Sequence, residues 1–470
     1  PQVSNFVVPT NAFRNGDFSA VTAGIRDPLT NLPFAGGLIP SSRINPVSRY
    51  FQDTFYPQAN SGPDRFQNVA VFPNSDTQHS TRIDHRISDR NTMFGRFLYH
   101  HFEFTQWDGA NPLVGIRDQY RDQYNLVLSD THTFSPALLN EFRFGYAQDD
   151  SKFQGPNRGR DVVQAAGLQL ADLTDVPAMP RMDIAGLQSV FQTNMGGWTW
   201  DNYYVSNVLH HVKGKHNLKY GVDIGMYRGT LLPTSPSLTY GTFTFNGRFS
   251  GHPYADYLLG LMDNSARSTS VGFITRRRNN TEFYITDDIK VTTRLSVNLG
   301  LRYSLLDPGI TSDNLTANFS PIHNALLVPD DASRSRIHPG FPGNIPVATG
   351  ESVGLGARLA RFDRNNFGPR IGVAWRPTQK GDWVLRGGAG VYYVTQHPNP
   401  PEGGGPPFEL RESFTNFIGA TGPAFTFPRP FPAAGFVLGG TGASGMNPYL
   451  RTPYSMQYNV TVEKQFGDVG

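Results

Sequence analysis

A single run, LSVNLGLRYSL from Leu295 to Leu305, decides the fold of this chain. Every second side chain in it is apolar, and the side chains between them are small, polar or charged. The apolar set is Leu295, Val297, Leu299, Leu301, Tyr303 and Leu305, and the other set is Ser296, Asn298, Gly300, Arg302 and Ser304. Successive side chains of a β-strand point to opposite faces, so a period of two predicts a strand with one apolar and one polar side.

The same alternation recurs along the chain, in pairs of segments joined by tight turns. The expected strands are 79–87 with 92–103, 122–133 with 139–149, 200–212 with 216–228, 281–291 with 295–306, 367–376 with 383–395, and a last strand at 454–463. A further pair is expected at 240–249 and 265–276, with a short helix between them that starts at Pro253 and stops at Gly260. The connections between pairs are long. Short turns at one rim and long loops at the other are typical of outer-membrane barrels.

Strand length and composition support a membrane barrel. Ten strand residues tilted by about 45° rise roughly 23 Å, close to the apolar band of about 25 Å in such barrels. Hydrophobic residues make up only 38% of the chain, and no run of about 20 apolar residues offers a transmembrane helix. Aromatic residues gather at the strand ends like two interfacial girdles: Phe134, Trp375, Trp383 and Phe466 near the short turns, and Tyr146, Trp198, Trp200 and Tyr393 near the long loops. We therefore expect an all-β, antiparallel transmembrane β-barrel.

The chain divides into two regions. Residues 1–75 lack sustained periodicity and are predicted to form a long irregular loop region on the extracellular side. Residues 76–470 are predicted to form a partial outer-membrane β-barrel of paired antiparallel strands. Because the chain starts at Pro1 and stops soon after a strand-like run, we expect it to be a fragment of a longer secreted precursor.

Short motifs, in a fixed order along nearly the whole chain, carry a family resemblance. They are Gly16-Asp17-Phe18-Ser19, Asp27-Pro28-Leu29-Thr30, Ile39-Pro40, Arg43-Ile44, Arg82-Ile83-Asp84-His85, Phe94-Gly95-Arg96, Leu139-Asn140-Glu141, Leu299-Gly300-Leu301-Arg302-Tyr303, Phe367-Gly368-Pro369-Arg370, Arg386-Gly387-Gly388 and Pro453-Tyr454-Ser455-Met456-Gln457. The chain resembles the β-barrel portion of Oar-like TonB-dependent transporters, which carry a carboxypeptidase-regulatory-like domain before the plug. The resemblance implies a bacterial outer-membrane barrel of roughly 22 strands around a plug, powered by TonB, of which this chain supplies about half.

The two faces of the strands supply the candidate site residues. Polar residues at inward positions are expected to face the lumen and the plug: Lys219, Asp223, Arg302, Arg370 and Arg386. Apolar residues at outward positions are expected to face lipid: Leu218, Val222, Ile224 and Val297. The inward residues either contact the plug and water or bind a solute, and both interpretations stay open.

No catalytic, cofactor or metal site is predicted, and the chain is not expected to be an enzyme. The adjacent pairs His100-His101 and His210-His211 point to opposite faces of a strand, so neither pair chelates one ion. The glycine run 387–390 is no phosphate loop, because no helix pattern follows it. The run 276–278, three consecutive arginines, is expected at an outer loop, where it contacts lipopolysaccharide phosphates or only solvent.

The leading functional interpretation is TonB-dependent transport of a large solute through a plugged barrel. The alternatives are a passive porin-like channel and a soluble β-rich glycan-binding protein or adhesin. The expected partners are outer-membrane lipid and lipopolysaccharide, the plug of the same precursor, TonB (by resemblance only) and a solute that the sequence does not identify. A net charge of +3 gives no reason to expect nucleic acid.

Overall fold

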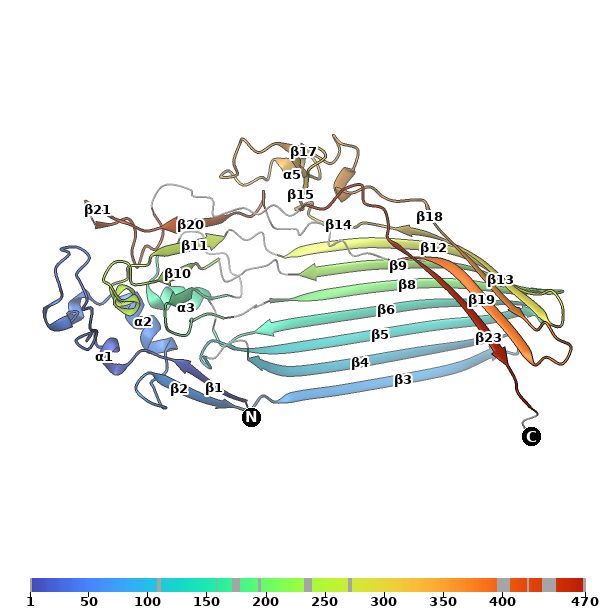
Figure 1. The fold of residues 1–470 in the computed structure, drawn as a ribbon, viewed down its shortest axis with the longest axis horizontal. Helices are drawn as coiled ribbons and strands as arrows, with labels where there is room; N and C mark the ends of the chain where they lie inside the picture. Colours follow the sequence, from blue (N-terminus) through green and yellow to red (C-terminus); the bar gives the residue numbers. More distant parts are fainter. Residues whose placement is uncertain are drawn as a thin grey trace.

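The computed structural model describes residues 2–107, 111–157, 159–170, 178–192, 196–231, 239–268, 273–394, 406–420, 422–432 and 445–467. One large sheet of long strands dominates it (Figure 1). Most other elements gather beyond one end of these strands, and the short turns lie at the opposite end. The arrangement is the one that paired strands with alternating turn lengths predict.

The large sheet has twelve strands, and every pairing in it is antiparallel. Its order is β23-β19-β18-β13-β12-β9-β8-β6-β5-β4-β3, with the short β14 (Ile310–Thr311) beside β12. The long strands are β3 (Asn74–Ser88), β4 (Asn91–Trp107), β5 (Ile116–Ser135), β6 (Leu138–Gln154), β8 (Gly196–Lys213), β9 (His216–Leu231), β12 (Ile274–Lys290), β13 (Leu295–Leu306), β18 (Asn366–Trp375), β19 (Trp383–Tyr393) and β23 (Tyr454–Lys464). The predicted all-β antiparallel architecture is confirmed.

The strands differ from the predicted ones chiefly at the long-loop end. β5 has 20 residues, and β12 begins at Ile274, seven residues before the predicted start. Cross-strand polar pairs extend the ladder there: Thr105 donates to Asp118 at 2.7 Å. Because both faces of these extensions are polar, the alternation that marks a membrane strand is lost.

The predicted pair at 240–249 and 265–276 does not belong to the large sheet. β10 (Thr242–Phe245) and β11 (Asn264–Ser268) do pair antiparallel, but in a separate sheet with β7 (Arg181–Ile184) and β20 (Arg411–Thr415). Phe243 and Phe245 are fully buried in a core at the loop end, which explains their misleading alternation. The helix predicted between them is confirmed as α4 (Pro253–Leu258), where His252 accepts the Tyr254 N–H and Gly260 has a φ of +71°.

The remaining elements are short. The strands are β1 (Gln2–Val7), β2 (Arg65–Ala70), β15 (Asn318–Ser320), β16 (Ala325–Val328), β17 (Val347–Thr349), β21 (Ile418–Gly419) and β22 (Gly422–Pro423). The helices are α1 (Asn11–Arg14), α2 (Pro46–Phe55), α3 (Gly159–Ala166) and α5 (Asp331–Arg334), and 3₁₀ turns cover Ala35–Gly37, Ser41–Arg43 and Gly356–Arg358. No described helix is both long enough and apolar enough to cross a membrane.

The hydrophobic core that contains Phe243 and Phe245 lies beyond the long-loop end of the large sheet (Figure 1). We call its surroundings the cap, the described parts of 2–70, 159–192, 239–268 and 406–432. Within it, α2 packs beside α4: Ser48 donates to the Tyr257 carbonyl at 2.5 Å, and the Tyr257 hydroxyl donates to the Ser48 carbonyl at 2.7 Å. The buried Arg14 donates to the carbonyls of Gln52 and Tyr56 at the end of α2.

Residues 1–75 therefore carry more regular structure than their sequence indicates, with α2 and the β1–β2 pair. These elements could not be recognised from the sequence, because each is too short to show a hydrophobic period and turns separate them. Two of the motifs meet here: Arg43 forks onto Asp27 at 2.8 and 3.0 Å. The motif glycine Gly16 has a φ of +80°, and a Cβ on it would lie 2.8 Å from the Ile39 carbonyl oxygen.

Candidate functional site: the polar face of the large sheet

Register divides the large sheet into a polar and an apolar face. Across β9, β12 and β13, Asp223 pairs with Glu282, and Glu282 pairs with Ser304. Directly paired residues lie on one face, so polar positions of neighbouring strands fall together. The apolar face presents exposed side chains such as Leu299, at 42% exposure, and Tyr458, at 86%. A soluble sandwich would cover such a face with a second sheet. The other described sheets have only two to four strands, and none of their strands pairs with a strand of the large sheet.

The four sequence-predicted outward residues share the apolar face. Leu218 pairs with Asp287, Val222 with Phe283 and Ile224 with Thr281, while Val297 pairs with Ile289. None of the four is buried. Of the three arginines at 276–278, only Arg277 falls on this face, since Arg276 and Arg278 occupy the alternate positions of β12. Contact of Arg277 with lipopolysaccharide stays a prediction.

An ion-pair network joins four strands on the polar face. Arg302 on β13 donates to Glu282 on β12 at 3.0 Å and to Asp223 on β9 at 3.1 Å. Asp223 also accepts from the hydroxyls of Tyr204 (2.7 Å) and Ser206 (2.8 Å) on β8. Of the sequence-predicted inward residues, the structure brings Asp223 and Arg302 together, and Lys219, Arg370 and Arg386 lie elsewhere on the same face.

Sequence reasoning missed Glu282, Tyr204 and Ser206 as parts of this network. Their strand parity alone places them on the polar face, because Tyr204 and Ser206 alternate with outward Tyr203 and Val205. What the sequence does not show is which strands become neighbours at which register. A second charged contact on the same face, Arg121 with Asp149 at 2.7 Å, was missed for the same reason.

Aromatic rings on the polar face lie over glycines. A Cβ on Gly221 would be 2.0 Å from the Tyr284 ring, and a Cβ on Gly229 would be 2.1 Å from the Trp200 ring. In both cases the ring and the glycine are directly paired on neighbouring strands. Trp200 therefore does not belong to the lipid girdle predicted for it, and neither does Trp198, whose indole N–H donates to Asp149 on the polar face. The rings lie flat because glycine leaves room beside the backbone.

Three arginines of the polar face differ in their partners. Arg302 pairs with carboxylates as described, and Arg386 on β19 donates to Glu463 on β23 at 2.7 Å. Arg370 on β18 instead stacks on the Tyr392 ring, 4.5 Å from its centroid. Its Nε atom is buried and has no hydrogen-bond partner among the described residues. Arg370 lines a hollow of about 360 Å³ with Asn298, Gly372, Gly388, Tyr392, Gln457 and Asn459, and with the backbone of neighbouring residues.

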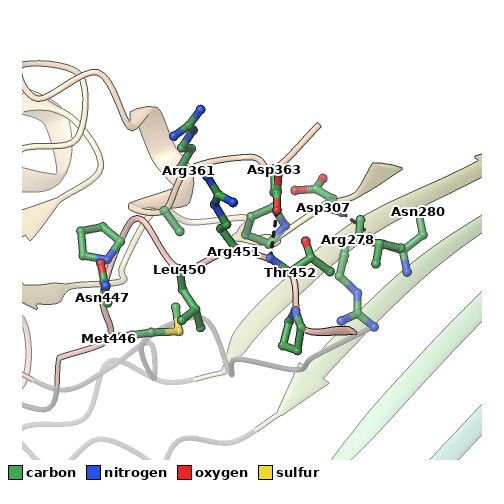
Figure 2. Close-up of a pocket in the computed structure, with 15 residues that line it drawn as sticks. Arg278, Asn280, Asp307, Arg361, Asp363, Met446, Asn447, Leu450, Arg451 and Thr452 are labelled. Atoms are coloured by element: carbon green, nitrogen blue, oxygen red, sulfur yellow. Dashed lines mark hydrogen bonds between the residues drawn. The ribbon is translucent and has the colours of Figure 1, made fainter. Parts of the chain in front are cut away.

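A smaller hollow, of about 60 Å³, lies where β12 meets the long loops (Figure 2). Asp363 there accepts the Thr452 N–H at 2.9 Å, and Asp307 accepts a forked pair of bonds from Arg358. Figure 2 shows Arg361 extending away from the other labelled side chains. These contacts tie loop segments to the sheet, and the cationic side chains do not converge on a site.

Within the described part of the chain, no three His, Asp or Glu side chains are grouped so as to hold a metal ion. His100 and His101 follow the geometry expected of strand neighbours. His100 contacts Asp76, and His101 contacts Asp122 on the opposite face. Each histidine is thus engaged separately.

Comparison with known proteins shows which family has a sheet of this kind. No curated protein matches the chain. Three solved structures are similar. The outer membrane transporter YddB from Escherichia coli has a TM-score of 0.46 and 11% identity, over 86% of this chain and 39% of that one. The ferric-catecholate import receptor Fiu from E. coli K12 has a TM-score of 0.34 and 11% identity, over 74% of this chain and 50% of that one, and P. aeruginosa FpvA bound to heterologous pyoverdines has a TM-score of 0.40 and 9% identity, over 86% of this chain and 49% of that one. The chain spans half or less of each. A family model described as outer membrane beta barrel domain matches residues 1–469. The chain belongs to this family of outer-membrane β-barrels.

Proposed function

We propose that the chain is the β-barrel portion of an Oar-like TonB-dependent transporter that moves a large solute through a plugged barrel. The observation that supports it best is the network of Asp223, Glu282 and Arg302, which holds charge on one face of three adjacent strands. Charges in a membrane barrel belong to the lumen, because a charge on the lipid face is costly at the midplane. A sheet with such a polar face can form the wall of a lumen that is filled by water or by a plug.

In this proposal Lys219, Asp223, Arg302, Arg370 and Arg386 face the lumen and the plug, and Leu218, Val222, Ile224 and Val297 face lipid. The cap, with residues 1–75, lies on the extracellular side, where the long loops of outer-membrane barrels lie. Lipopolysaccharide surrounds the outer rim. The plug of the same precursor fills the lumen, and TonB supplies the energy from the inner membrane.

Conductance of the full-length precursor in planar lipid bilayers tests the proposal. A plugged transporter is expected to show no steady open channel until the plug is loosened, for example with urea. A passive porin-like channel, the second candidate, would show steady open conductance at once. Proximity crosslinking of the precursor to TonB in living cells then tests the energy coupling, and repeated failure to crosslink would contradict it.

A further inference from the structure

Arg370 differs from Arg302 and Arg386 on the polar face because no neighbouring strand in the described part of the chain supplies it with a counter-ion. Arg302 has Glu282 and Asp223, and Arg386 has Glu463. No carboxylate or hydrogen-bond acceptor within the described ranges pairs with Arg370, and its Nε atom is shielded from water. Arg370 is half-buried and borders a hollow, and a guanidinium whose Nε–H has lost water without gaining a hydrogen bond is unfavourable, so an acceptor on its open side would stabilise it.

The surroundings of Arg370 leave room for such an acceptor. The ring of Tyr392 holds the guanidinium from one side by a cation–π contact. Gly372 and Gly388 form a floor without side chains, and a Cβ on Gly388 would lie 3.2 Å from Oδ1 of Asn459. A hollow of about 360 Å³ remains above them.

We infer that the Arg370 hollow binds a carboxylate group of a molecule in the lumen. The planar fork of arginine matches the two oxygens of a carboxylate, and such forked pairs are shorter and stronger than neutral hydrogen bonds. The amides of Gln457 and Asn459 on β23 supply further donors beside it. The carboxylate comes from the transported solute or from an acidic side chain elsewhere in the precursor. The inference rests on the proposed function, since it requires the polar face to line a lumen.

A cysteine reporter beside a residue that lines the hollow tests this inference. The 470 residues contain no cysteine, and Ser455 on β23 is directly paired with Tyr392. Full-length precursor with Ser455→Cys, in isolated outer membranes, is labelled with anionic and with cationic methanethiosulfonates, with and without millimolar citrate as the carboxylate probe. Arg370→Gln is compared with the matched control Arg386→Gln, whose arginine already has Glu463.

If a solute carboxylate is the ligand, citrate slows labelling several-fold in the parent and in Arg386→Gln, and has no effect in Arg370→Gln. If a carboxylate of the precursor fills the hollow, both reagents react slowly, citrate changes nothing, and Arg370→Gln accelerates labelling. The inference is overturned if neither citrate nor Arg370→Gln changes any labelling rate. Because no uptake is measured, a passive channel would still show the effect, which separates failure of this inference from failure of the proposed function.

Discussion

Leu299 and Asn298 are neighbours on β13 that face opposite sides of the sheet. An arginine at the lipid midplane of a barrel costs roughly 2–4 kcal/mol, so Leu299→Arg should reduce the heat-modifiable folded barrel in outer membranes. Asn298→Arg should leave folding nearly intact, because Asn298 already bonds to Asp288, whose carboxylate can pair with the new charge. Gel mobility of heated and unheated membranes measures both variants.

Leu299→Trp distinguishes lipid from a packed protein core. Lipid accepts a larger apolar side chain, whereas overpacking a core costs about 1–3 kcal/mol. Leu299→Cys should react with a lipid-phase probe, and Asn298→Cys with a small aqueous one. The membrane assignment of this face fails if Leu299→Trp is as damaging as Leu299→Arg and Leu299→Cys resists the lipid-phase probe.

Gly221 is predicted to tolerate no side chain while Tyr284 lies over it. Gly221→Ala should destabilise the barrel by about 1–3 kcal/mol, because the Tyr284 ring must leave its place. The control is Gly387→Ala, whose Cβ would meet only the Asn459 carbonyl oxygen, at 3.6 Å. Urea midpoints of the refolded full-length protein measure both. Adding Tyr284→Ala should make Gly221→Ala nearly harmless, and full additivity of the two changes would contradict the account.

At the scale of a single element, α4 carries a buried carboxyl group, that of Asp256, whose pKa lies within the pH range in which proteins are usually studied. Burial raises the pKa of Asp256 to about 6, although the Phe249 and Ser250 N–H groups donate to it. A raised pKa in the folded state means that its stabilisation is full below about pH 4 and is lost as pH rises through about 6. Wild type should therefore lose up to about 3 kcal/mol of cap stability relative to Asp256→Asn over this range. Hydrogen exchange at α4 measures it.

Asp27 provides a control of opposite sign. The hydrogen bonds from Arg43 lower its pKa, so its contribution is present at neutral pH and is lost as pH falls below about 4. The advantage of wild type over Asp27→Asn should grow with rising pH below about pH 4 and then stay level between about pH 4 and 6, where its advantage over Asp256→Asn shrinks. Parallel trends for the two variants would show that the exchange reports some other titration.

At the level of elements, the sequence predicts a strand wherever one face meets an apolar phase. β13 shows this from Leu295 to Leu305, and its boundaries agree with the structure to within one residue. β10 was predicted too long and in the wrong sheet, because alternation also arises where alternate residues enter the core of a globular region. The contact of Asp223 with Arg302 could not be predicted from the sequence, because it joins residues 79 positions apart.

As a whole molecule, the sheet has two edge strands, β3 and β23. Unpaired backbone groups of an edge strand are a template for pairing with another chain. Expressed alone, these 470 residues should therefore aggregate without detergent, as light scattering or size exclusion would show. A monodisperse, soluble monomer of this chain would contradict the membrane assignment of its apolar face.

The composition of the cap has a consequence for how the protein is made. Asn45 donates to the carbonyl of Phe427, so one hydrogen bond closes a span of 382 residues. This partner of Asn45 thus becomes available only after 382 further residues have been synthesised. Contacts of such separation form slowly. We therefore expect the cap to complete its packing only after the intervening hairpins have formed.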